Sequence, residues 1–286
     1  DRIDLVVDLA GHTGHNRLGT LAKRPAPVQV TYLGYPNTTG LTTIDYVLVD
    51  SVTAPEDESK RFVETPFRLD GGFSCFAPRD DVPPVGPLPA LRNGYVTFGA
   101  THGLIKLNAV VLDLWSELLR AVRNSRLRIA RDMLSGEARE RLRVQFLDRG
   151  IDAERVEFHT PPVGASGYWD LYHDFDIALD TFPWSGHTTA CEALWMGVPV
   201  ITLRGKIHAA RMVASALTHA RLTDWIASSK ARYVALAAKR AADVNELTKL
   251  RAGLREHVRN SPLCDAAGFT RKLEEAYRTM WRKWCK

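Results

Sequence analysis

The stretch "DTFPWSGHTTACEALWMGVPVITL", from Asp180 to Leu203, indicates the fold class because it contains one complete turn between elements expected to be buried. An apolar run that ends at Asp180 predicts a strand, Thr189–Met196 predicts a helix, and Pro199–Leu203 predicts the next strand. Strand, helix and strand in this order indicate a parallel sheet. The turn Gly186–Thr189 is small and rich in hydroxyl groups, which suits either a helix N-cap or a bound anion.

The same alternation continues on both sides of this stretch. The expected strands are Tyr95–Ala100, Arg126–Ala130, Arg155–His159, Asp176–Asp180 and Pro199–Leu203. The expected helices are Asn108–Val122, Gly136–Arg149, Tyr168–His173, Thr189–Met196 and His208–Leu217, and two long ones, about Lys230–Arg259 and Ala266–Trp284, close the chain. Strands rich in apolar residues that alternate with amphipathic helices predict an α/β fold, with helices on both faces of a parallel sheet of at least five strands.

A proline-rich stretch precedes this region. "DDVPPVGPLPALRNG", from Asp80 to Gly94, contains four prolines and two glycines and predicts a linker without helix or strand. Before it we expect a short helix near Arg17–Lys23 and strands at Leu5–Leu9, Val28–Leu33 and Tyr46–Val49. These boundaries divide the chain into residues 1–88, 89–260 and 261–286.

The composition is typical of a soluble globular protein, with 45% hydrophobic and 25% charged residues among 286. No apolar run approaches the roughly 20 residues that span a bilayer, so we expect no membrane span. The four cysteines are widely spaced and form no CxxC pair, which argues against a zinc site and favours a reducing, cytoplasmic location. Residue 1 is not Met, and we expect the chain to be part of a longer protein.

Much of the net charge of +5 lies at the C-terminal end, where Phe269–Lys286 has six basic and two acidic residues. A basic helix is one feature of nucleic-acid-binding proteins. However, Leu273, Tyr277, Met280 and Trp281 recur at helical spacing. We therefore favour an amphipathic helix that packs on the body of the protein, and we expect no nucleic-acid partner.

Two expected turns carry residues suited to a phosphate. At the carboxyl end of a strand, the turn before Thr188 and Thr189 would offer free backbone N–H groups and hydroxyl donors. Lys106 follows the first strand of the same sheet, so it would reach a diphosphate from the same edge. Glu192, one helical turn beyond Thr188, would either accept from a ribose hydroxyl or simply favour the helix dipole. We assign no GxGxxG motif, no P-loop and no acidic motif of the DxD kind for Mg²⁺.

Three separate blocks resemble the catalytic region of O-linked N-acetylglucosamine transferases. The blocks are "KRPAPVQVTYLGYPNTTGLTTIDYVLVD" (Lys23–Asp50), "SGHTTACEALWMGVPVITL" (Ser185–Leu203) and "SPLCDAAGFTRKLEEAYRTMW" (Ser261–Trp281). This family also contains plant SPINDLY-type O-fucosyltransferases and bacterial cytoplasmic N-glucosyltransferases. The resemblance implies a GT-B fold with two Rossmann-like lobes. It also implies that the N-terminal lobe is incomplete in this chain and that tetratricopeptide repeats lie upstream.

The resemblance also implies roles for individual residues. Lys106 would contact the donor diphosphate, Thr188 and Thr189 would cradle it, and His187 would lie near the phosphates and the sugar. Glu192 would meet the ribose, and Tyr168 would stack on a pyrimidine where relatives have a base-binding histidine. The catalytic candidates are therefore Lys106, His187 and also His12, which flanks the carboxyl end of the first strand; for His12 a structural role in a turn stays open. Ala165 and the pair His102–Gly103 depart from the family pattern.

The implied activity is that of an inverting glycosyltransferase that moves N-acetylglucosamine, or a related sugar, from a UDP-sugar to protein Ser or Thr. Its partners would be a nucleotide sugar and a protein acceptor, and no metal or other cofactor is expected. Two alternatives remain open. One is N-glucosyl or O-fucosyl transfer within the same family, and the other is a nucleotide-binding or interaction fragment without turnover of its own.

Overall fold

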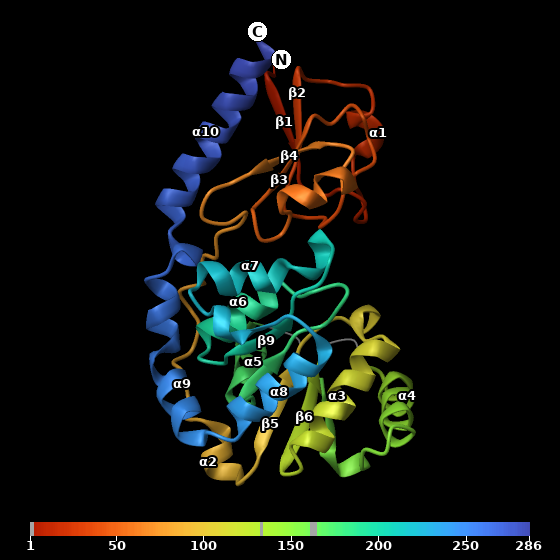
Figure 1. Cartoon of the computed structure of the whole chain (residues 1–286), viewed down its shortest axis with the longest axis vertical. Coiled ribbons are helices and arrows are strands. Elements are labelled where there is room, and N and C mark those ends of the chain that lie inside the picture. Colours follow the sequence, from red (N-terminus) through yellow and green to blue (C-terminus); the bar gives the residue numbers. More distant parts are fainter. Residues whose placement is uncertain (1–2, 132–133, 161–164) are drawn as a thin grey trace.

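The computed structural model describes residues 3–131, 134–160 and 165–286. Two parallel sheets lie one above the other along the long axis of the molecule (Figure 1). The first sheet has four strands in the order β1-β2-β3-β4, and the second has six in the order β10-β9-β8-β5-β6-β7. The predicted α/β fold with parallel sheets is thus confirmed.

The first sheet is built from β1 (Leu5–Asp8), β2 (Val28–Thr31), β3 (Tyr46–Val49) and β4 (Thr65–Arg68). The first three strands match the sequence prediction, and α1 (Leu18–Leu21) is the short helix expected between β1 and β2. Strand β4 was not predicted. It contains Pro66 and forms the edge of the sheet, which is where a strand tolerates a residue without an N–H group.

The second sheet contains β5 (Val96–Ala100), β6 (Ser125–Ala130), β7 (Val156–His159), β8 (Ile177–Leu179), β9 (Val200–Leu203) and β10 (Ile226–Ala227). All neighbours pair in parallel, which confirms the expectation of at least five strands. Only β10 was missed, because its two residues are too few to show a pattern. The strand order reverses between β5 and β8, and in such sheets this point opens a crevice at the carboxyl ends of the strands.

The helices of the second sheet are α3 (Ala109–Ala121), α4 (Gly136–Leu147), α5 (Ala165–Asp170), α6 (Thr188–Trp195), α7 (Met212–His219), α8 (Lys230–Ala241) and α9 (Val244–Arg259). Helix α3 packs against α4, and α6 packs against α7. From β5 the chain moves along the sheet to β6 and β7, and from β8 it moves in the opposite direction to β9 and β10. Because such crossovers are right-handed, the two helix pairs lie on opposite faces of the sheet.

Two helix predictions were wrong in detail. The long helix expected at Lys230–Arg259 is two helices, because the Asp243 side chain accepts a hydrogen bond from the Glu246 N–H group and starts α9 anew. The stretch from Asp80 to Gly94 was expected to hold no helix, yet it ends in α2 (Pro89–Asn93). Proline in the first turn and a left-handed glycine, Gly94, at the end are the signals that allow this short helix.

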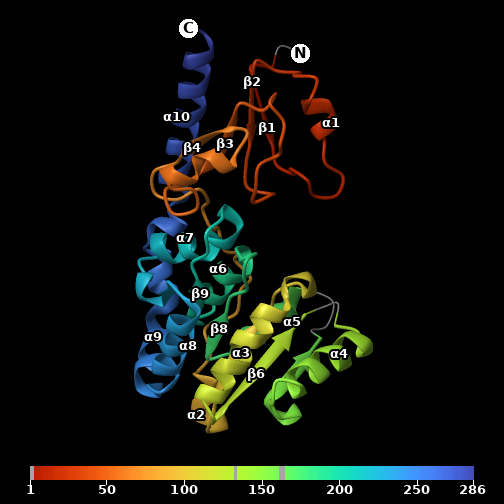
Figure 2. The same cartoon turned by 45° about the vertical axis from the view of Figure 1, so that its right-hand side comes forward.

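The C-terminal helix α10 (Ala266–Trp284) returns to the first sheet and runs beside it in both views (Figures 1 and 2). Met280, only 1% exposed, packs with Ala276 against Val28, Val30 and Leu48. Leu273, Tyr277 and Trp281 join this cluster half-buried, so the predicted packing of the apolar stripe is confirmed. Among the described residues, no helix is both long and apolar enough to cross a membrane.

Candidate functional site

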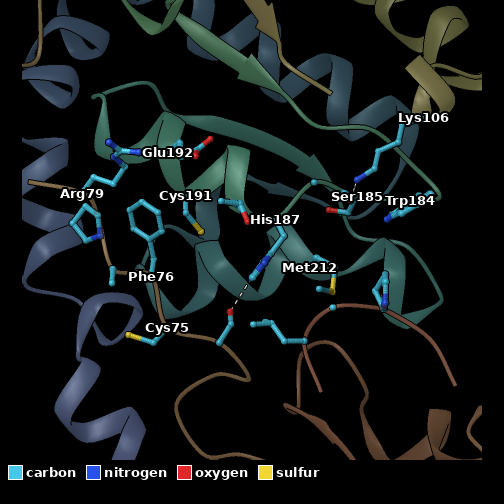
Figure 3. Close-up of a pocket in the computed structure, with 18 of the residues that line it drawn as sticks. Cys75, Phe76, Arg79, Lys106, Trp184, Ser185, His187, Cys191, Glu192 and Met212 are labelled. Atoms are coloured by element: carbon cyan, nitrogen blue, oxygen red, sulfur yellow. Dashed lines mark hydrogen bonds between the residues drawn. The ribbon is translucent and has the colours of Figure 1, made fainter. Parts of the chain in front are cut away.

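A cavity of about 610 Å³ opens between the two sheets, at the point where the strand order of the second sheet reverses (Figure 3). Four parts of the chain form most of its wall. They are a loop after β2 (Leu33, Gly34, Pro36), the segment Ser74–Arg79, the turn after β5 with Lys106, and the turn after β8 with α6 (Trp184 to Thr188, Cys191 and Glu192). Trp169 and Met212 complete the wall. The two turns that the sequence singled out therefore share one cavity.

Asp180, at the end of β8, builds the turn that precedes α6. Its buried carboxylate accepts hydrogen bonds from Ser185 Oγ (2.7 Å), the Gly186 N–H group (2.7 Å) and Thr202 Oγ1 (2.6 Å), and His102 Nε2 lies 3.3 Å away. Burial alone would raise the pKa of Asp180, but these donors lower it below its usual value. The carboxylate is thus charged and holds the turn in one shape.

Lys106 lies on the 3₁₀ turn Leu104–Lys106 after β5 and reaches the same turn. Its Nζ donates to the Ser185 carbonyl oxygen at 2.7 Å and stands 4.7 Å from the centre of the Trp184 ring. Burial lowers the pKa of Lys106, and Asp180 opposes that effect. Lys106 is therefore a half-buried cation held at the rim of the cavity, where an incoming anion would compete for its N–H groups.

His187 and Thr188 stand at the N-terminal end of α6, where backbone N–H groups are free. His187 Nε2 lies 2.8 Å from Ser74 Oγ. Burial lowers the pKa of His187 from 6.5 to about 4, with a smaller effect of Lys106 in the same direction, so the ring is neutral near pH 7. Thr188 is exposed and lines the cavity. Thr189 does not line it, because its side chain turns toward Gly186.

Glu192 also lines the cavity, one helical turn beyond Thr188. Its Oε2 accepts hydrogen bonds from the hydroxyl groups of Tyr168 (2.6 Å) and Tyr172 (3.3 Å). Burial raises the pKa of Glu192, although both tyrosines oppose this shift. Tyr168 itself is absent from the described lining, and its neighbour Trp169 is present. The hydroxyl group of Tyr168 is bonded to Glu192 and its side chain does not line the cavity, so its stacking on a base stays a prediction.

His12 is not among the residues that line the cavity, and its catalytic role stays a prediction. Its Nε2 lies 2.8 Å from the Thr39 carbonyl oxygen, and its ring packs edge-on against Tyr35 at 5.2 Å. It contributes to the shape of the loop whose residues Gly34 and Pro36 line the cavity. The structural role that the sequence left open is the one the structure shows.

Several lining residues were missed from the sequence, above all Ser74 and Trp184. Ser74 follows Gly71 and Gly72, whose φ angles of 83° and 107° turn the chain back toward the second sheet. A glycine pair shortly before a single serine is the signal that could have pointed to it. Trp184 carries no such signal, since an aromatic residue in a turn has many structural uses.

An acidic pair with DxD spacing, Asp174 and Asp176, was overlooked in the sequence. Asp176 is buried and accepts from the N–H groups of Ala90 (2.8 Å) and Thr97 (2.7 Å), and Asp174 Oδ2 pairs with Arg128 at 2.5 Å. Both carboxylates therefore have structural partners. Within residues 3–131, 134–160 and 165–286 no group of three His, Cys, Asp or Glu side chains could hold a metal ion.

Two Rossmann-like sheets that face each other across a cavity define the GT-B class of glycosyltransferase fold. The sequence signature described as "Glycosyl transferase family 41" matches residues 1–72 and 89–273. The chain therefore belongs to glycosyl transferase family 41.

Named relatives agree with this assignment. Two proteins, each called "Probable UDP-N-acetylglucosamine--peptide N-acetylglucosaminyltransferase SPINDLY", from Oryza sativa subsp. japonica and Arabidopsis thaliana, are 44% identical over 100% of this chain. The chain spans only 31% of the length of either relative.

Two solved structures agree with the fold. A mutant of the Thermobaculum terrenum O-GlcNAc transferase superposes with a TM-score of 0.91 at 38% identity, over 99% of this chain and 54% of that one. Sucrose-phosphate synthase from Thermosynechococcus elongatus shares the fold alone, with a TM-score of 0.62 at 14% identity over 98% of this chain and 74% of the other.

Proposed function

We propose that this chain holds the nucleotide sugar in an inverting glycosyltransferase that transfers N-acetylglucosamine, or a related sugar, from a UDP-sugar to protein Ser or Thr. One observation carries the proposal. Lys106, His187 and Thr188 meet at the N-terminal end of α6, in a cavity that opens where the strand order reverses. This combination of a cation, free N–H groups and a hydroxyl group suits a diphosphate.

The same residues explain how the donor would react. In an inverting transfer the acceptor oxygen attacks the anomeric carbon while the nucleoside diphosphate leaves from the opposite side. Negative charge then grows on the leaving phosphate. Lys106 and the N-terminal end of α6 are already fixed in position, so they stabilise this charge without reorganising. Glu192 and Trp169 also line the cavity of about 610 Å³, and we assign the nucleoside to this part of the wall.

We further propose that transfer needs no metal ion, because Lys106 and the helix terminus supply the positive charge that a cation would otherwise bring. Sugar transfer by the full-length protein should then continue unchanged in excess EDTA. Loss of transfer in EDTA that returns with Mg²⁺ or Mn²⁺ would contradict this part of the proposal. We also propose a reducing, cytoplasmic location, because all four cysteines are free.

The names of the plant relatives favour UDP-N-acetylglucosamine as the donor and a peptide as the acceptor. Two other outcomes have a place in the test. UDP-glucose or GDP-fucose as the donor would keep the same site and change only the sugar or base. Binding without transfer in the full-length protein would point to a nucleotide-binding module.

Thermal unfolding with a panel of nucleotides tests the proposal. A ligand that binds only the folded state raises the melting temperature. UDP and UDP-N-acetylglucosamine should stabilise the chain more than GDP and GDP-fucose at equal concentration, and the full-length protein should then label a protein acceptor with the same sugar. No stabilisation by any of these ligands would overturn the proposed function.

A further inference from the structure

One hydrogen bond crosses the cavity and joins residues 113 positions apart in the sequence. Ser74 Oγ, in the segment that follows β4, lies 2.8 Å from Nε2 of His187, the residue before α6. Figure 3 draws this bond as the dashed line that ends at the His187 ring. Ser74 is only 8% exposed, and both residues line the cavity. The contact links the first sheet directly to the place where the diphosphate is expected.

Ser74 is held firmly by its neighbour Phe73. The Phe73 N–H group donates to Asp50 Oδ2 at 3.0 Å, and the Phe73 carbonyl oxygen accepts from the Tyr32 hydroxyl group at 2.7 Å. The Phe73 ring also lies beside the His187 ring, with centres 5.3 Å apart. Tyr32 and Asp50, which directly follow two strands of the first sheet, therefore fix the backbone from which the Ser74 side chain extends.

The His187 ring is neutral and so carries a single N–H group. Burial lowers its pKa to about 4, and the charges that act on it are Asp50, which raises the pKa, and Lys106, which lowers it. One neighbouring ring, His208, packs edge-on against Phe73 and is also held neutral, with a pKa of about 4. Near pH 7 the single ring proton of His187 is therefore on either Nδ1 or Nε2.

The two ring nitrogens of His187 face different partners. Nε2 faces Ser74, so Nδ1 is the atom that remains for a ligand. Ionised phosphate oxygens can only accept hydrogen bonds. His187 can therefore bond to a phosphate through Nδ1 only if Nδ1 carries the proton. Nε2 is then an acceptor, and the Ser74 hydroxyl group must donate to it.

We propose that Ser74 is a positioning residue that fixes His187 as the Nδ1–H tautomer and so makes the neutral ring a hydrogen-bond donor to the donor diphosphate. Both the diphosphate contact and the choice of tautomer rest on the proposed function, because a contact to a phosphate is what requires Nδ1–H. The tautomer can nevertheless be measured without a ligand, so its failure and the failure of the proposed function are distinguishable.

Nitrogen NMR of the ¹⁵N-labelled chain near pH 7 tests the tautomer directly. Comparison with His187→Gln assigns the ring. We expect a protonated Nδ1 and an unprotonated Nε2 in the wild type and in Ser74→Thr, which keeps the hydroxyl group. In Ser74→Ala the Nδ1–H form should decline. A wild-type ring with the proton on Nε2, or an unchanged ring in Ser74→Ala, would overturn the proposal.

Calorimetric titration with UDP tests the consequence. Ser74→Ala should weaken binding about 5- to 10-fold, near the usual value for one hydrogen bond, while Ser74→Thr stays close to wild type. Ser228→Ala, at an exposed serine outside the cavity, is the control and should bind as wild type. Equal affinity of Ser74→Ala and wild type would refute the positioning role. A wild type with the Nδ1–H ring that binds neither UDP nor GDP would instead overturn the proposed function and leave the tautomer standing.

Discussion

Replacing Lys106 by Met removes the cation from the rim of the cavity and nearly preserves the length of the side chain. In the structure the ammonium group is half-buried, donates to the Ser185 carbonyl oxygen and faces the Trp184 ring. It is therefore already in place when a diphosphate arrives, and little conformational entropy is lost on binding.

The expected loss follows from this geometry. A hydrogen bond to a charged group contributes about 1.5 to 3 kcal/mol, which corresponds to a Kd for UDP raised roughly 10- to 150-fold. The loss should not exceed this range, because the backbone N–H groups at the start of α6 remain. Partial burial limits screening by salt, so most of the effect should persist at about 0.15 M salt.

Calorimetric titration of UDP against wild type, Lys106→Met and Lys60→Met measures the effect. Lys60 is exposed and lies outside the cavity, so its variant controls for the loss of one positive charge. Thermal unfolding without ligand checks that both variants are folded. Equal affinity of wild type and Lys106→Met would refute the assignment of Lys106 to the diphosphate.

Three further predictions use other parts of the molecule. Thr188→Val should weaken UDP binding by about 0.5 to 1.5 kcal/mol in the same titration, less than Lys106→Met, because only a neutral hydroxyl donor is lost. Burial lowers the pKa of His208 from 6.5 to about 4. Between pH 6.5 and about pH 4 the His208 ring is therefore protonated in the unfolded chain and neutral in the folded one. The free energy of unfolding, measured with urea, should therefore fall as the pH drops through this window, by up to about 3 kcal/mol from this residue, and His208→Gln should show a shallower fall. Met280→Ala should destabilise the chain by about 2 to 5 kcal/mol in urea unfolding, whereas Trp284→Ala, at a residue 52% exposed, should cost far less.

Much of the fold could be predicted because the second sheet repeats one pattern. Apolar strands of four to six residues alternate with amphipathic helices there, and this pattern depends only on local sequence. Strands β4 and β10 were not predicted, because an edge strand with a proline and a strand of two residues do not show this pattern. The break at Asp243 was not predicted, because one capping side chain, not a change in periodicity, separates α8 from α9.

The sequence predicts only that part of the candidate site whose arrangement depends on strand order. Lys106 follows β5 and Thr188 follows β8, and these two strands are neighbours in the sheet, so their turns had to meet. Contacts between distant segments could not be predicted in this way. Ser74 reaches His187 only because the first sheet fixes Phe73, and Tyr168 turns to Glu192 because a partly buried carboxylate requires donors.

A crystal structure of this chain with UDP would show directly where the diphosphate binds. We expect the diphosphate at the N-terminal end of α6, within hydrogen-bond distance of Lys106 Nζ and of the backbone N–H groups that begin with Thr188. The ribose should lie toward Glu192. UDP bound elsewhere on the molecule, or in this cavity with its phosphates away from Lys106 and α6, would refute the proposed diphosphate site.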